Sequence, residues 1–144
     1  MDTVVNFWGV LVAAIAAFVL GGFWFGPFFG KPWMRAVGIT HEQMERMKEK
    51  GMSAMWRSYL AMFIGVLVMA YVLAHVLAVF SGSADAALGS LGVSGGLWMW
   101  IGFVAPVMLG PVLWEGRSWK YWFITAGYYL VSLILMGIII VALG

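Results

Sequence analysis

The chain has 144 residues, of which 64% are hydrophobic and 10% are charged, with a net charge of +2. A soluble domain is about half apolar and about a quarter charged, so we expect lipid rather than water to surround most of this surface. The absence of cysteine excludes disulfides and thiolate metal sites. So small a positive charge does not indicate a surface for nucleic acid.

The first predicted membrane helix covers residues 4–26, and its twenty-odd residues at about 1.5 Å each cross about 30 Å of hydrocarbon. Small residues follow one face, which allows another helix to approach closely in lipid. They are Gly9, Ala13, Ala16, Ala17 and Gly21. We expect this face to pack within the chain rather than to form the seam of a dimer.

A break at Gly26-Pro27 ends this helix, and Gly30, Lys31 and Trp33 follow it. At the end of a membrane helix a glycine lets backbones approach, a basic residue meets headgroups and a tryptophan lies in the interface. A similar run follows the third span and comprises Gly110, Pro111, Glu115, Gly116, Arg117 and Trp119. The two runs indicate either a parallel internal repeat of two helix hairpins or interface chemistry that both ends share.

Residues 31–57 form the long polar segment of the chain. Thr40 and Gln43 have the spacing of a capping box, which predicts a short amphipathic helix over 41–50 that ends at Gly51 and lies on the membrane surface. Its apolar face is rich in methionine: Met44, Met47, Met52 and Met55, with His41 nearby. Thioethers suit Cu(I), but an amphipathic helix needs apolar residues here anyway, so we expect no metal site.

Three more membrane helices are expected, over 58–80, 95–114 and 121–143. The stretch 81–96 is rich in glycine, serine and alanine and carries Asp85, so we predict a loop there. Pro106 in the third helix has no N–H and cannot donate to the Gly102 carbonyl, which predicts a kink. The fold class is therefore all-α, a four-helix transmembrane bundle with a surface helix between its first two spans.

All eight lysine and arginine residues fall between helices one and two or between helices three and four. They are Lys31, Arg35, Arg46, Lys48, Lys50, Arg57, Arg117 and Lys120. The positive-inside rule places this side in the cytoplasm and both termini outside. We expect a multi-pass protein of the inner membrane whose basic loops meet anionic lipid headgroups.

His75 is an ionisable residue inside a span, with Tyr71 four residues earlier on the same face. It is either part of a proton relay or ligand site, or a neutral histidine that bonds to the tyrosine, the backbone or a headgroup. Thr125, Tyr128 and Ser132 share a face of the last helix. They either line a polar cavity with the carbonyls freed near Pro106 or form hydrogen bonds between helices.

Glu115 and Arg117 lie in the turn before the last helix, where we expect Glu115 to form a structural ion pair with Arg117, Lys31 or Arg57. No phosphate loop, dinucleotide fingerprint, zincin motif or serine elbow is present. We therefore expect no enzyme activity and no cofactor.

The string Trp24-Phe-Gly-Pro-Phe-Phe-Gly-Lys-Pro-Trp33 resembles the hallmark of a bacterial membrane family, DUF1761, a domain of unknown function. Phe25 stands where that family usually has tyrosine. Further matches are Trp100-Ile-Gly-Phe103, Glu115-Gly-Arg117, Gly127-Tyr128 and Met136-Gly137. The resemblance implies a small four-helix integral membrane protein and implies no activity, substrate or catalytic residue.

Two functional hypotheses follow. The first is a non-catalytic membrane protein that acts by assembly, as a homo-oligomer or as an accessory subunit of a larger complex, because small-residue stripes abound and buried polar groups are few. The alternative is a small-solute or ion transporter or channel, formed by a dimer, with a polar path along the kinked third helix and the fourth.

Overall fold

The computed structural model describes residues 5–81 and 88–144, without the side chains of 52–54, 88 and 89. Its elements are α1 (Phe7–Phe23), η1 (Trp24–Phe28), α2 (Gly30–Val37), α3 (His41–Phe80), α4 (Leu88–Met99), η2 (Trp100–Val104), α5 (Leu109–Trp114) and α6 (Trp119–Leu143). The label η marks a π-helical segment. Every element in the described ranges is helical, so the predicted all-α class is confirmed.

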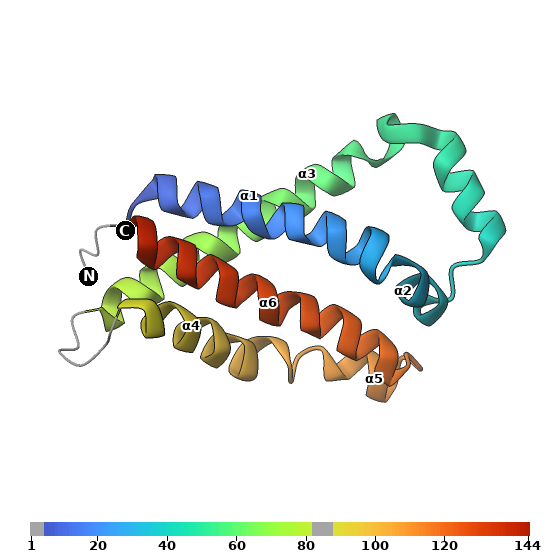
Figure 1. Cartoon of the computed structure of the whole chain (residues 1–144). Helices are drawn as coiled ribbons and strands as arrows, with labels where there is room; N and C mark the ends of the chain where they lie inside the picture. The colour runs from blue at the N-terminus through green and yellow to red at the C-terminus, as the bar shows by residue number, and fades with distance from the viewer. Residues whose placement is uncertain (1–4, 82–87) are drawn as a thin grey trace.

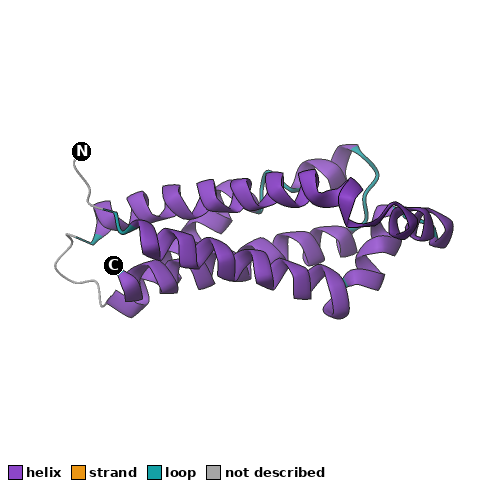
Figure 2. Cartoon of the chain, turned by 90° about the horizontal axis from the view of Figure 1, so that it is seen from above, coloured by secondary structure: helices purple, strands orange, loops and turns teal. Residues whose placement is uncertain are grey.

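Four segments are long and apolar enough to cross a membrane: Phe7–Phe28, Met55–Phe80, Ser90–Trp114 and Trp119–Leu143. α6 lies among the other three and packs against α4, α1 and α3 (Figure 1). The C-terminus and the start of α1 lie at one end of the bundle, and α2 and α5 lie at the other. The view from above shows the same elongated bundle, with helical segments projecting beyond it at one end (Figure 2).

The small-residue face of α1 packs inside the chain. Ala13, Ala14 and Ala17 are fully buried, and a Cβ placed on Gly9 would lie 3.5 Å from the Cβ of Leu143 in α6. Asn6 caps the start of α1 and donates its side-chain N–H to the Leu143 carbonyl at 2.7 Å, which ties the two helix ends together. The expectation that this face packs within the chain is confirmed.

The sequence predicted a loop over the whole of 81–96, but α4 already begins at Leu88. Its glycines bring α4 against α6: a Cβ on Gly92 would lie 2.5 Å from the Gly137 carbonyl oxygen, and one on Gly96 would lie 2.6 Å from that of Leu133. Glycine weakens a helix in water, but in lipid it allows backbones to touch. Asp85 and Val4, the first residue of the predicted 4–26 helix, lie outside the described residues.

The capping box at the start of α3 is confirmed. The Thr40 hydroxyl accepts from the Gln43 backbone N–H at 3.2 Å, and the Thr40 N–H donates to the Gln43 side chain at 3.1 Å. Gly51 has φ 68°, outside the helical region, and interrupts α3 where the amphipathic helix was predicted to end. The short helix α2 was not predicted; it ends at Gly38, which has φ 82°.

The contact between α4 and α6 yields a first prediction. Gly96→Ala places a methyl group against the α6 backbone, which has no side chain to move, so we expect the free energy of unfolding to fall by about 1–3 kcal/mol. The matched control is Gly102→Ala, where a Cβ would meet nothing within 4 Å. Thermal unfolding of both purified variants in detergent tests this. Equal stability of the two variants would contradict the packing described here.

Candidate functional site

Two tryptophan indoles bind the backbone of α6 from neighbouring spans. The Nε1 of Trp24 donates to the Ile124 carbonyl at 2.9 Å, and the Nε1 of Trp100 donates to the Ala126 carbonyl at 2.7 Å. An indole N–H must find an acceptor once it leaves water. These two acceptors are two residues apart on α6, so spans one and three hold it at nearly the same depth.

Each of these tryptophans opens a π-helical segment. η1 begins Trp24-Phe-Gly and η2 begins Trp100-Ile-Gly. Such segments are rare and frequently occur at functional sites. The predicted internal repeat pairs Gly26-Pro27 with Gly110-Pro111, whereas the two π segments pair Trp24 with Trp100. Because the two pairings differ, the internal repeat stays a prediction.

Trp122 of α6 compensates for the break at Pro106. The ordinary helix ends at η2 and resumes at α5, and residues 105–108 form turns between them, so the predicted interruption is present. The Trp122 Nε1 donates to the Ala105 carbonyl at 3.3 Å, and the Val107 carbonyl accepts from the Gly110 N–H at 3.4 Å. Two backbone carbonyls beside the break, those of Ala105 and Val107, are thus satisfied inside the protein.

Tyr128 lies in the centre of the bundle and is 2% exposed. Its hydroxyl donates to the Ala17 carbonyl of α1 at 2.9 Å. A Cβ on Gly21 would lie only 3.0 Å from the same hydroxyl, so this glycine makes room for the phenol. The sequence allowed this polar face either to line a cavity or to form hydrogen bonds between helices, and Tyr128 forms such a hydrogen bond.

Thr125 and Ser132 share the face of Tyr128 but do not open a cavity with it. Ser132 is 1% exposed, and the Thr125 hydroxyl is buried without a hydrogen-bond partner in the described part of the chain. Tyr128 lines one of the four cavities described below, whereas Thr125, Ser132, Pro106 and His75 line none of the four. The hydroxyls of Thr125 and Ser132 are thus both buried polar groups of this face without a hydrogen-bond partner among the described residues.

His75 lies toward the end of the bundle where α1 begins, away from Thr125 near the start of α6. Its Nδ1 is 2.9 Å from the Tyr71 carbonyl oxygen, and its ring packs on that of Tyr71 at 4.3 Å between centroids. Tyr71 is 42% exposed and stacks on Phe7 of α1. The contact of His75 with its own helix matches the structural interpretation, and the structure does not bring His75 to the other candidates.

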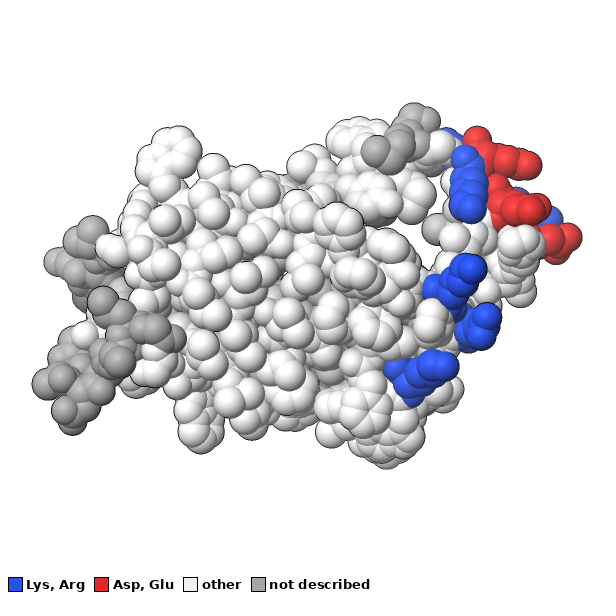
Figure 3. Space-filling model, viewed as in Figure 1, with Lys and Arg blue, Asp and Glu red and all other residues white. Residues whose placement is uncertain are grey.

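The charged side chains gather at the end formed by α2, the start of α3 and the turn before α6 (Figure 3). Arg117 donates to the Val37 carbonyl at 2.6 Å and lies over the Tyr121 ring, so it joins the end of α2 to that turn. Glu115 makes no ion pair with any described residue. A salt bridge joins His41 to Glu45 at 3.6 Å on the exposed surface.

The residues at the end of the first span, from Gly26 to Trp33, have separate roles. Gly26 and Pro27 lie in η1 and are exposed, as is Lys31, whereas Gly30 is buried. A Cβ on Gly30 would lie 2.7 Å from the Phe25 carbonyl oxygen, which explains the glycine. Trp33 packs its ring edge-on against that of Phe25 at 5.4 Å. In the similar run from Gly110 to Trp119, Trp119 is 53% exposed, as a residue of the interface would be.

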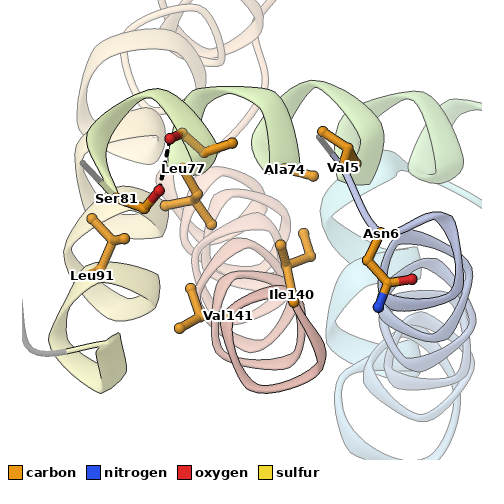
Figure 4. A pocket seen from close by; sticks show the side chains of 10 residues that line it. Val5, Asn6, Ala74, Leu77, Ser81, Leu91, Ile140 and Val141 are labelled. Atoms are coloured by element: carbon orange, nitrogen blue, oxygen red, sulfur yellow. Dashed lines mark hydrogen bonds between the residues drawn. The ribbon is translucent and has the colours of Figure 1, made fainter. Parts of the chain in front are cut away.

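Four cavities among the described residues are large enough to consider as binding sites. One of about 300 Å³ occupies the end where α1 begins, with Asn6, Ser81 and Leu77 among its lining (Figure 4). At the basic end a small cavity of about 270 Å³ lies on the surface helix, and an apolar one of about 340 Å³ lies between α2 and the first part of α3. The largest of the four, about 660 Å³, lies between α1 and α3.

The methionine face of the surface helix lines the cavity beside α2, through Met44, Met47 and Met55. His41 is directed away into solvent, with 92% of its side chain exposed. The side chain of Met52 lies outside the described ones. No group of three or more His, Cys, Asp or Glu residues forms a metal site within residues 5–81 and 88–144.

Four apolar spans, three of which pack against the fourth, α6, define a multi-pass, all-α membrane protein. The chain belongs to the family described as protein of unknown function (DUF1761), whose family model matches residues 8–141, nearly the whole chain. The resemblance seen in the sequence is thereby confirmed. Comparison with curated proteins and with solved structures gives no match.

The Tyr128 hydrogen bond yields the second prediction. Tyr128→Phe keeps the ring and removes the donor to Ala17, so we expect the free energy of unfolding in detergent to fall by about 1 kcal/mol. Tyr129→Phe, at the next residue, removes a hydroxyl and leaves that bond intact, so it serves as the control. Reversible unfolding of both variants measures the difference. A Tyr128→Phe variant that is no less stable than the control would show that the bond contributes nothing.

Proposed function

We propose that this protein is a non-catalytic membrane protein that acts by assembly, either as a homo-oligomer or as an accessory subunit of a membrane complex. The observation that carries the proposal is the use of the interior polar side chains. Trp24, Trp100, Trp122 and Tyr128 all donate to backbone carbonyls of the same chain. Groups committed in this way hold the fold together, which leaves the outer surface for function.

One outer face of α3 has the composition of a helix-packing surface. Ala61, Gly65, Val68 and Val72 follow one another at helical spacing and are all exposed. A Cβ on Gly65 would meet nothing within 4 Å. Ala61 and Gly65 are a pair of small residues four apart, a spacing that allows another helix to approach closely in lipid, so this face supports contact with a second chain.

The alternative function is a small-solute or ion path formed by a dimer along the third and fourth spans. The unsatisfied Thr125 hydroxyl and the break at Pro106 favour it. Assembly is the better supported of the two because His75 and Thr125 lie toward opposite ends, and because Tyr128 already has an acceptor within the bundle.

We further propose that the protein lies in the inner membrane with its basic end in the cytoplasm and both termini outside. Support comes from the lysine and arginine residues, which all belong to the end that contains α2 and the turn before α6. The positive-inside rule relates such an asymmetry to orientation. Anionic headgroups are the expected partners of this end.

The orientation is the third prediction. Because the chain has no cysteine, single cysteines report on their own positions. We expect a membrane-impermeant maleimide to label Ser81→Cys in intact cells, and to label Glu49→Cys and Glu115→Cys only after permeabilisation. Labelling of Glu49→Cys in intact cells would reverse the orientation. Labelling of Glu49→Cys and Glu115→Cys from opposite sides would contradict the topology itself.

Assembly is the fourth prediction. Gly65→Leu adds bulk to the small face of α3, so we expect the dissociation constant of the oligomer to rise about tenfold or more, or about 1.4 kcal/mol. Ile64→Phe adds bulk to a neighbouring outward flank and is the control. Native mass spectrometry in mild detergent measures the populations. A wild-type protein that is monomeric there, and that recovers nothing in pull-downs from native membranes, would end the proposal.

A further inference from the structure

A groove separates α1 from the first turns of the membrane part of α3. The two helices cross about midway along α1 in the view of Figure 1 and diverge from there toward the basic end. The groove has a volume of about 660 Å³ and lies between Phe18–Gly26 on one side and Trp56–Met62 on the other, with Tyr128 at its base. This volume is within the range of about 300–1,000 Å³ typical of ligand sites.

Two glycines keep the groove open. A Cβ on Gly22 or Gly26 would meet nothing within 4 Å, whereas one on Gly21 would press on Tyr128. Gly22 and Gly26 are one helical turn apart and form a strip without side chains along the α1 wall. The side chains of Phe18, Phe25 and Met62 make the rest of the lining largely apolar. An occupant must therefore be apolar along most of its length.

The position of the groove along the spans indicates what that occupant is. It lies in the last turns of the span Phe7–Phe28 and the first turns of the span Met55–Phe80. Both belong to the hydrocarbon directly beneath the headgroups of the basic side. An acyl chain that enters from this side reaches the groove without crossing a polar layer.

The charge at the mouth of the groove is positive. The basic end carries all eight lysine and arginine residues of the chain against four glutamates, at 42, 45, 49 and 115. Arg57 is exposed and its guanidinium lies over the ring of Trp56, a groove residue, at 5.6 Å from the ring centroid. The space-filling view shows a hollow beside these basic side chains (Figure 3). A phosphate at the headgroup level meets this charge.

We propose that the groove binds an anionic phospholipid of the surrounding membrane. Its phosphate pairs with the Arg57 guanidinium, an arrangement that arginine favours over lysine, and one acyl chain lies along Gly22 and Gly26. Tyr59, which is 47% exposed, lines the groove two residues after Arg57. The lipid then bridges α1 and α3 where the two helices do not touch each other.

The full-length protein, reconstituted with equal amounts of phosphatidylglycerol and phosphatidylcholine, tests this proposal. Native mass spectrometry gives the ratio of the two lipids retained, and phosphatidylglycerol with a photoactivatable acyl chain gives the site of contact. We expect wild-type protein to retain phosphatidylglycerol several-fold over phosphatidylcholine, with cross-links in 18–26 and 56–62. Arg57→Gln should bring the ratio close to one, and Gly22→Leu should abolish the cross-links.

Matched controls separate this site from general attraction to a basic surface. Lys120→Gln removes a charge from the same end outside the groove, and Gly110→Leu fills an open glycine elsewhere in the spans; both should behave as wild type. Equal losses of lipid preference in Lys120→Gln and Arg57→Gln would overturn the proposal. The proposal would also be overturned if the cross-links persist in a folded Gly22→Leu variant. The same holds if a dimer is lost in this variant while its lipid retention is unchanged.

The lipid site and the assembly proposal can be tested independently of each other. Ala61 and Gly65 lie on the outward side of α3, whereas Tyr59 and Met62 face the groove. We expect a monomeric Gly65→Leu variant to keep its preference for phosphatidylglycerol. Loss of that preference together with the oligomer would place the lipid between two copies of the chain and not in the groove.

Discussion

The fold depends on hydrogen bonds between side chains and the backbone of a neighbouring helix, made where there is no water to compete. Trp24 and Trp100 donate to carbonyls of α6, while α6 returns donors from Trp122 to the third span and from Tyr128 to the first. In hydrocarbon an unsatisfied polar group costs several kcal/mol. α6 is therefore held on both sides in a single register, and helices with π turns and prolines are tolerated beside it.

The close packing of α6 reinforces this register. Gly92 and Gly96 bring the α4 backbone against that of α6, while Gly9 lies where α1 packs on the last turn of α6. Helices in lipid gain little from burying apolar side chains, because the lipid tails are equally apolar, so direct contact and hydrogen bonds must hold them. α6 meets both conditions, whereas Trp56, Tyr59 and Met62 of α3 line the open groove beside α1. This part of α3 thus leaves surface for other molecules.

Hydropathy and charge predicted four spans, their order and the gathering of the basic loops at one end of the bundle, because lipid imposes length and polarity on every span. Local chemistry predicted the capping box at Thr40 and the interruption at Gly51. The start of α4 was missed because the rules for glycine and serine in loops come from water. The π segments were missed since nothing in Trp-x-Gly alone requires them. Nothing in the sequence indicated that the indole N–H groups of Trp100 and Trp122 turn inward to backbone carbonyls.

The candidate site shows the same limit at single residues. Gly21 and Gly22 are neighbours in the sequence, yet one makes room for the Tyr128 hydroxyl and the other faces an open groove. A small-residue pattern cannot separate these two uses, because both need only the absence of a side chain. The distinction arises where α3 leaves α1, which depends on the contacts of α6 elsewhere. The surface open to lipid or to another chain is therefore a consequence of how the interior is held.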